Sequence, residues 1–197
     1  LATKIIFGIG KSGHLAETVR NYGNKVLIVT MQELMDLGLL ESAIEDLKKN
    51  NIQFEVFPDV RPEPKRQDFE SAISLAKSEQ FDVIVGFGGG SCIDFAKALS
   101  ICSTHRKDVW EFVNLSNRPP AFIDRDKVLP IISVPTTAGT GSEVTPYSVV
   151  INNETLQEGT IKDLSIVPKV AIVDPGLMRA LPKDWTAITG IDAFSHA

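Results

Sequence analysis

The chain has 197 residues, of which 43% are hydrophobic and 23% are charged, with a formal net charge of −5. This size and composition fit one globular domain, or one domain and the beginning of another. The mild acidity and the scattered Lys and Arg residues argue against nucleic acid or an anionic membrane as a partner, and no apolar stretch approaches the ~20 residues that span a bilayer.

The two cysteines, Cys92 and Cys102, do not form a CxxC motif. Two cysteines in a chain of this length do not indicate a disulfide scaffold, so a reducing, cytoplasmic location is expected. The first residues, LATKIIFGIGKSG, lack the long apolar core of a secretory signal.

Short apolar runs rich in β-branched residues recur along the chain, and each is followed by turn residues. Such runs are typical of buried strands. Amphipathic segments at residues 31–51, 64–80 and 91–104 lie between several of the runs and predict helices. Strands that alternate with helices in this way predict an α/β fold with a parallel sheet and flanking helices. In chain order the predicted strands are KIIFGIG, KVLIVT, FEVF, DVIVGFGGG, VLPIISVPTT and VAIVDP.

Two segments depart from this alternation. VINNETLQEGTI, residues 150–161, has the pattern of two short strands around a polar turn and predicts a hairpin. The tail KDWTAITGIDAFSHA has a helical pattern, with Trp185 as a candidate core residue. We therefore predict a domain boundary near Pro182, with an α/β domain at residues 1–181 and the beginning of a helical domain at residues 182–197.

The most informative internal motif is GFGGGSCID, in which a buried strand leads through three glycines and Ser91 directly into a helix. Consecutive glycines allow backbone conformations that other residues avoid, and they leave room for a ligand. The helix that follows presents free N–H groups and the positive end of its dipole. The motif therefore predicts a phosphate or pyrophosphate site at Gly89, Gly90 and Ser91, although a plain βα turn would have the same outline.

A second candidate site is SVPTTAGTGSEVTP, which follows the next strand. Small hydroxyl side chains on a glycine-containing backbone suit ribose and phosphate oxygens, and the carboxyl ends of parallel strands are where open α/β sheets bind ligands. A serine- and threonine-rich surface loop remains the alternative. The candidate ligand-binding residues are Thr136, Thr137, Thr140 and Ser142.

Two pairs, each of an Asp and a basic residue, complete the candidates. Asp192 and His196 are four residues apart, so they share a helical face and could provide two metal ligands, although surface residues often show the same spacing. Asp94 and Lys97 share a face of the helix after the glycines. They could pair with each other or reach toward the phosphate and the second loop.

Taken together, GGGSCIDFAKAL, PTTAGTGSEVTPYSVV, VAIVDPGLMRALP and TAITGIDAFSHA resemble the iron-containing, metal-dependent (group III) alcohol dehydrogenases. The four blocks match in order and separation across essentially the whole chain. The resemblance implies a Rossmann-like nucleotide domain followed by a helical metal domain, and it implies that further metal-binding histidines lie beyond residue 197. It also implies a cytoplasmic enzyme, often a homodimer, that oxidises alcohols or reduces aldehydes and ketones with NAD or NADP.

Residue roles follow from the resemblance. Gly89, Gly90 and Ser91 are expected to hold the cofactor pyrophosphate, and Asp192 and His196 are expected to be the catalytic ligands of Fe²⁺, with Zn²⁺ also compatible. Asp94, Thr136, Thr137, Thr140, Ser142, Lys162 and Leu177 are expected near the cofactor.

One departure concerns Met31. Many members of the family carry an Asp directly after the second strand, where a carboxylate accepts the adenosine ribose hydroxyls and repels a 2′-phosphate. Met31 carries no such charge, so the choice between NAD and NADP stays open.

Two alternative functions also stay open: an enzyme like the glycerol dehydrogenases or dehydroquinate synthase, and a dinucleotide-binding module without catalysis.

Overall fold

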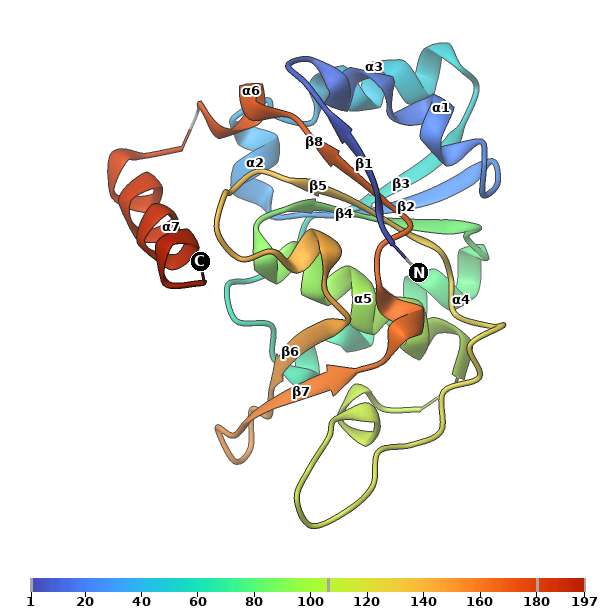
Figure 1. Cartoon of the computed structure of the whole chain (residues 1–197). Coiled ribbons are helices and arrows are strands. Elements are labelled where there is room, and N and C mark those ends of the chain that lie inside the picture. Colours follow the sequence, from blue (N-terminus) through green and yellow to red (C-terminus); the bar gives the residue numbers. More distant parts are fainter. Residues whose placement is uncertain (1, 106, 180, 197) are drawn as a thin grey trace.

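A parallel sheet forms the centre of the molecule. The computed structural model describes residues 2–105, 107–179 and 181–196, for His196 the backbone only. Within these residues, six strands pair in the order β1-β8-β5-β4-β2-β3, and every neighbouring pair is parallel. Figure 1 shows the resulting twisted sheet. The strands are β1 (Lys4–Phe7), β2 (Lys25–Val29), β3 (Gln53–Phe57), β4 (Val83–Gly88), β5 (Ile131–Pro135) and β8 (Val170–Val173).

Helices cover both faces of this sheet (Figure 1). One face packs against α1 (Leu15–Val19) and α3 (Glu41–Lys49), and the other packs against α4 (Phe69–Glu79) and α5 (Gly90–His105). Each interface has its own hydrophobic core, because the buried side chains of a parallel strand alternate between the two faces. The central strands β4 and β5 are buried along their whole length, which explains their nearly uninterrupted apolar sequence.

A hairpin lies beneath α5, outside the main sheet (Figure 1). Strands β6 (Tyr147–Ile151) and β7 (Glu158–Lys162) pair antiparallel, which confirms the predicted hairpin. The shorter elements are α2 (Gln32–Asp36), α6 (Pro175–Met178), and the 3-10 helices η1 (Lys11–His14), η2 (Arg66–Asp68), η3 (Val109–Phe112), η4 (Ser142–Val144) and η5 (Leu164–Ile166).

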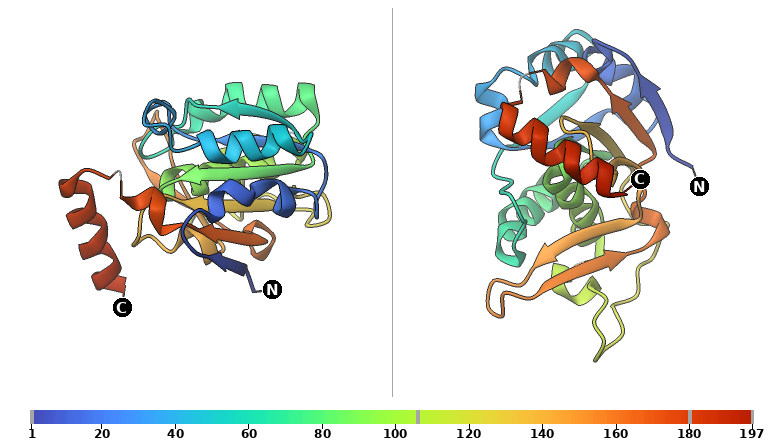
Figure 2. Two further views of the ribbon diagram at one scale, coloured as in Figure 1. Left: turned by 90° about the horizontal axis from the view of Figure 1, so that it is seen from above. Right: turned by 60° about the vertical axis from the view of Figure 1, so that its left-hand side comes forward.

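The last helix, α7 (Lys183–His196), stands apart from the sheet (Figure 2). Large apolar side chains are exposed along it, including Trp185 at 53%, Ile191 at 70% and Phe194 at 85%. Trp185 is therefore not a core residue of the described chain, contrary to expectation. An apolar helix surface of this extent is suited to packing against other helices.

The predicted helix over residues 31–51 is divided into α2 and α3. Gly38 lies between them with a φ of 70°, and its N–H donates to the carbonyl oxygen of Met35 at 2.8 Å. This left-handed turn ends the first helix, as glycine commonly does. Leu37 consequently lies outside the buried face and is 57% exposed.

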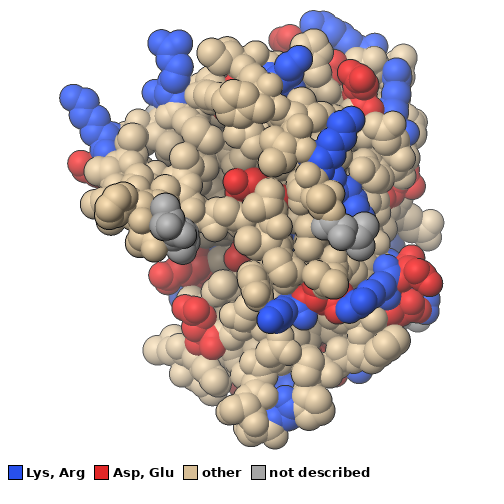
Figure 3. All heavy atoms as spheres, in the orientation of Figure 1, with Lys and Arg blue, Asp and Glu red and all other residues tan. Residues whose placement is uncertain are grey.

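None of the helices in the described part of the chain is long and apolar enough to cross a membrane. On the face of the molecule shown in Figure 3, acidic and basic side chains are interspersed among uncharged ones.

Candidate functional site

The glycine turn after β4 leads directly into α5. Gly88 has a φ of 149°, and a Cβ atom there would lie 2.4 Å from the Sγ atom of Cys92. The amides of Cys92 and Ile93 both donate to the carbonyl oxygen of Gly89, at 3.1 and 3.2 Å, which forms the first turn of the helix. The N–H groups at the start of a helix have no acceptor within it, so they are available to an anion at this edge.

The loop after β5 closes over this glycine turn. The amide of Thr136 donates to the carbonyl oxygen of Gly88 at 3.0 Å. A Cβ atom on Gly90 would lie 3.0 Å from Cγ2 of Thr140, and one on Gly89 would lie 3.4 Å from the side chain of Thr137. The two predicted ligand-binding segments therefore form one surface at the carboxyl ends of β4 and β5, and the absence of side chains on the glycines allows this close approach.

A buried charged cluster lies directly behind that surface. Lys97 is completely buried, and its ammonium group lies 2.9 Å from the hydroxyl of Ser142 and 2.7 Å from the carbonyl oxygen of Tyr147. It also pairs with the carboxylate of Asp94 at 3.4 Å, and that carboxylate accepts hydrogen bonds from the Ser142 hydroxyl and the Val149 amide. Lys97 and Asp94 thus both pair with each other and reach the second loop.

Asp174 organises the neighbouring end of β8. It is 2% exposed, and its two carboxylate oxygens accept four hydrogen bonds. The donors are the amides of Gly10, Ser12 and Gly176 and the hydroxyl of Ser12, at 2.7–3.1 Å. One side chain therefore caps α6 and fixes the loop after β1. Burial raises the pKa of Asp174, but the hydrogen bonds outweigh that effect and hold the pKa below its ordinary value.

Asp174→Asn should lower the free energy of unfolding by about 2 kcal/mol at pH 7, because an amide cannot accept all four bonds and leaves buried donors unsatisfied. A depressed pKa gives stability that is present above the unfolded value of about 3.9 and is lost as the pH falls through the folded value. The difference between the two proteins should therefore shrink below about pH 4, which urea unfolding at a series of pH values measures. A difference that is constant down to pH 2 would contradict this account.

Asp192, on α7, lies next to the second loop. A Cβ atom on Gly139 would lie 2.4 Å from the carbonyl oxygen of Thr189 and 3.2 Å from a carboxylate oxygen of Asp192. The glycine therefore allows α7 to approach the loop backbone. The side chain of His196, the other predicted metal ligand, lies outside the described residues. The described residues contain no group of three or more His, Cys, Asp or Glu side chains that could hold a metal ion.

The remaining predicted cofactor residues lie on other elements of the fold. Met31 follows β2, forms an isolated bridge with Asp59, and packs partly buried against the core. Leu177 is 7% exposed in α6 and packs against the other core. Lys162 ends β7, where its ammonium lies 5.4 Å from the centre of the Tyr147 ring. The roles of these residues stay predictions.

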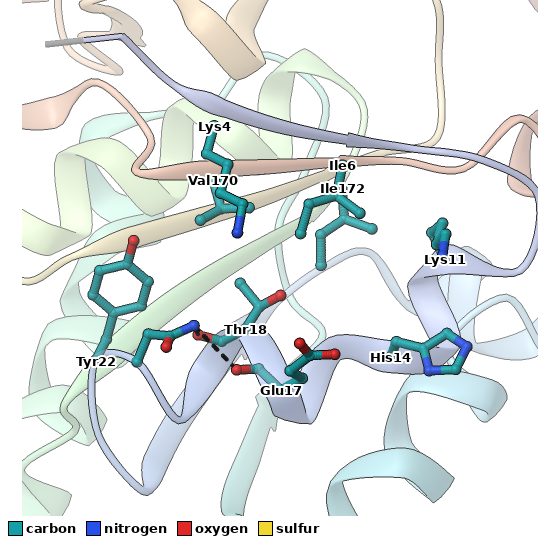
Figure 4. A pocket seen from close by; sticks show the side chains of 10 residues that line it. Lys4, Ile6, Lys11, His14, Glu17, Thr18, Tyr22, Val170 and Ile172 are labelled. Atoms are coloured by element: carbon teal, nitrogen blue, oxygen red, sulfur yellow. Dashed lines mark hydrogen bonds between the residues drawn. The ribbon is translucent and has the colours of Figure 1, made fainter.

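A cavity of about 590 Å³ lies elsewhere, between α1 and the adjoining face of β1 and β8 (Figure 4). Its lining includes Lys4, His14, Thr18 and Tyr22, together with Ile172. Its lining comes from β1, η1, α1 and β8 and includes no residue of the loops after β4 and β5, so it does not belong to the surface described above.

Known proteins of similar sequence and fold identify the family of the chain. The family model described as iron-containing alcohol dehydrogenase matches residues 2–175. The chain belongs to this family. The match confirms the resemblance.

Individual relatives extend the match to nearly the whole chain. Long-chain-alcohol dehydrogenase 1 of Geobacillus thermodenitrificans is 37% identical over 96% of this chain and 47% of its own length. The archaeal Red Sea brine pool alcohol dehydrogenase ADH/D1 superposes with a TM-score of 0.93 at 34% identity, over 98% of this chain and 49% of its own. The NADH-dependent butanol dehydrogenase A of Thermotoga maritima superposes with a TM-score of 0.90 at 31% identity, over 98% and 48%. The chain thus spans about half the length of these alcohol dehydrogenases.

Proposed function

We propose that the polypeptide containing this chain is an NAD(P)-dependent alcohol dehydrogenase that transfers a hydride between an alcohol and the nicotinamide ring. In this proposal residues 1–181 form the dinucleotide-binding domain and residues 182–197 begin a helical metal-binding domain. The observation that carries the proposal is the closure of the Thr136–Ser142 segment over the glycine turn, with Asp192 brought to the same loop at Gly139. Family membership supports the reaction class.

The glycine turn suits the pyrophosphate of the cofactor. Gly89, Gly90 and Ser91 offer backbone N–H groups at the start of a 16-residue helix, whose dipole favours a negative charge there. Thr137 and Thr140 lie against this turn, and their hydroxyl groups can donate to and accept from ribose and phosphate oxygens. Thr136 and Ser142 are proposed cofactor residues of the same loop, and the Ser142 hydroxyl is already bound to Asp94 and Lys97. The chain's own contribution to catalysis is then to bind and orient the cofactor, which itself supplies the hydride chemistry.

Asp192 and His196 are proposed as two ligands of a divalent metal ion, Fe²⁺ or Zn²⁺. Carboxylate and imidazole suit either ion, and their separation of four residues places them on one helical face. Two ligands do not complete a site, so this chain needs further ligands from elsewhere in the polypeptide. When bound, such an ion would polarise the oxygen of the substrate.

Two further properties complete the proposal. The outer edge of β1 is unpaired in the described sheet, and its own residues Ile5 and Phe7 are 58% and 69% exposed, which supports a homodimer formed through this strand.

Cys92 and Cys102 are both buried and unpaired, and burial raises the pKa of the Cys92 thiol to about 12, so neither is suited to nucleophilic chemistry. Unpaired cysteines support a cytoplasmic location.

The direct test is an assay of the intact protein from its natural source, with its mass, its metal content and its alcohol oxidation measured on one sample. We expect a mass near twice 21.5 kDa, about one divalent metal ion per chain, and alcohol-dependent reduction of NAD or NADP. Metal removal should abolish turnover and leave NADH binding intact. A protein that binds NADH but contains no metal and oxidises no alcohol would instead be a dinucleotide-binding module.

Met31→Asp should shift the cofactor preference toward NAD. The residue follows β2, the position at which a carboxylate can accept the ribose hydroxyls and repel a 2′-phosphate. We expect the ratio of kcat/KM for NAD to that for NADP to rise by about tenfold or more, given charge repulsion of about 1–3 kcal/mol at a partly screened site. Met31→Asn is the matched control, because Asn has the shape of Asp without its charge. An equal effect of both variants would show that charge at this position does not set the preference.

A further inference from the structure

We propose that Lys97 is a positioning residue that holds the Thr136–Thr145 loop in the conformation that receives the cofactor. It does so by fixing the C-terminal end of the loop to α5. The inference deepens the proposed function and rests on it for the identity of the ligand. The buried ammonium group joins α5 to the end of the loop, and the loop in turn contacts the glycine turn.

The oxygen atoms around Lys97 come from two parts of the chain. Asp94 is one helical turn earlier on α5, at 3.4 Å. Ser142, Thr145 and Tyr147 belong to the end of the loop and the start of β6, and their oxygens lie at 2.9, 3.4 and 2.7 Å. The ammonium group thus joins α5 to a segment 45 to 50 residues later in the sequence.

Burial of the Lys97 ammonium group costs free energy that its contacts must offset. An ammonium group without access to water is stabilised only when its hydrogen-bond donors are used, and here the four oxygens surround a side chain with no exposed surface. Burial lowers the pKa of Lys97, while Asp94 and Glu143 act to raise it. An apolar residue of the same length could fill the space, but it could not bind two hydroxyl oxygens of the loop and the carbonyl oxygen at the start of β6 at once.

The contact is transmitted to the candidate cofactor surface through Ser142. The amide of Ser142 donates to the hydroxyl of Thr140 at 3.3 Å, and Thr140 in turn packs over Gly90. Lys97 itself is buried behind the loop and does not face the glycine turn. Its role is therefore to fix the loop before the cofactor arrives, which reduces the entropy that binding must overcome.

Lys97→Met in the intact protein tests this role. We expect the Kd for NADH and the KM for NAD to rise by at least about tenfold, because the loop must be ordered on binding, while kcat at saturating cofactor stays within about threefold. Glu143 lies within the loop, so V8 protease should cleave after it at least about ten times faster in the variant, measured by mass spectrometry. Cleavage after Glu154, in the exposed hairpin turn, is the internal reference.

Two further variants separate positioning from simple stability. Ser148→Ala removes a buried hydrogen bond of 2.7 Å from the hairpin to the carbonyl oxygen of Asp94 and does not touch Lys97. It should lower the melting temperature without changing the Kd for NADH. The double variant Asp94→Asn with Lys97→Met removes both charges, and it should regain stability but keep the weak NADH binding and the rapid cleavage.

The outcomes are distinct. If Lys97→Met binds NADH as tightly as the wild type, or if the double variant restores binding, Lys97 only neutralises Asp94 and the inference is wrong. If Lys97→Met does not fold, Thr145→Val weakens the same contact from the loop side and should still raise the Kd by about two- to threefold; an unchanged Kd overturns the inference. Failure of the wild-type protein to bind NADH would instead overturn the proposed function, while cleavage after Glu143 would still report whether Lys97 fixes the loop.

Discussion

Gly90→Asp should reduce the affinity for NADH by about 100-fold or more. The new carboxylate would stand at the start of α5, where the proposal places the cofactor pyrophosphate. At a separation of about 5 Å and an effective dielectric constant of about 20, two like charges repel by about 3 kcal/mol, which corresponds to roughly 200-fold in Kd. A fluorescence titration of the intact enzyme with NADH measures the effect.

Two controls separate charge from shape. Gly90→Ala adds only a Cβ atom, 3.0 Å from the Cγ2 atom of Thr140, so the Thr140 side chain must shift by a few tenths of an ångström. We expect about a tenfold loss or less. Ser71→Asp adds the same charge at an exposed position of α4 and should leave the Kd unchanged. If Gly90→Asp is folded and binds NADH like the wild type, the pyrophosphate does not lie on this turn.

The parts of the fold that the sequence predicts are those governed by local pattern. The strand runs, the hairpin at residues 150–161 and the helix after the three glycines all agree with the structure, because periodicity and turn residues act over a few positions. The two ligand-binding segments could also be expected to meet, since both follow parallel strands and the carboxyl ends of neighbouring strands lie at one edge.

The contacts that connect these segments could not be read in the same way. An Asp and a Lys three residues apart normally form an exposed pair of little energetic value, yet Lys97 has no exposed surface and binds atoms about 50 residues away. His105 accepts a hydrogen bond from the amide of Asp124, 19 residues later, at 2.8 Å. Asp174 binds the amide of Gly10 across 164 residues. Such partners are fixed by tertiary packing, which no local spacing reveals.

The approach of α7 to the cofactor loop is another contact of this kind, and it brings together the two halves of the proposed active site. Gly139 has a φ of 146°, a conformation that side chains disfavour, and its position faces the backbone of Thr189. The glycine signature of this loop therefore has two causes. One is access for the cofactor, and the other is access for the helix that carries Asp192.

Gly139→Ala should consequently impair turnover much more than cofactor binding. A Cβ atom 2.4 Å from the Thr189 carbonyl oxygen forces the helix to retreat by about 1 Å, and a displacement of that size at a reacting centre can cost about 100-fold in rate. We expect kcat/KM for the alcohol to fall by about that factor, while the Kd for NADH changes by less than about threefold, because the glycine turn and Thr140 keep their contacts.

Gly141→Ala is the matched control for this prediction. Gly141 also has a positive φ, 64°, but a Cβ atom there meets no described atom within 4 Å. It should therefore show only the conformational cost of about 1 kcal/mol in stability and nearly normal turnover. Equal losses of kcat/KM in both variants would mean that loop strain, and not the approach of α7, determines the rate. A loss of kcat/KM confined to Gly139→Ala, with the Kd for NADH unchanged, is the result expected if turnover depends on α7, and with it Asp192, lying against the cofactor loop.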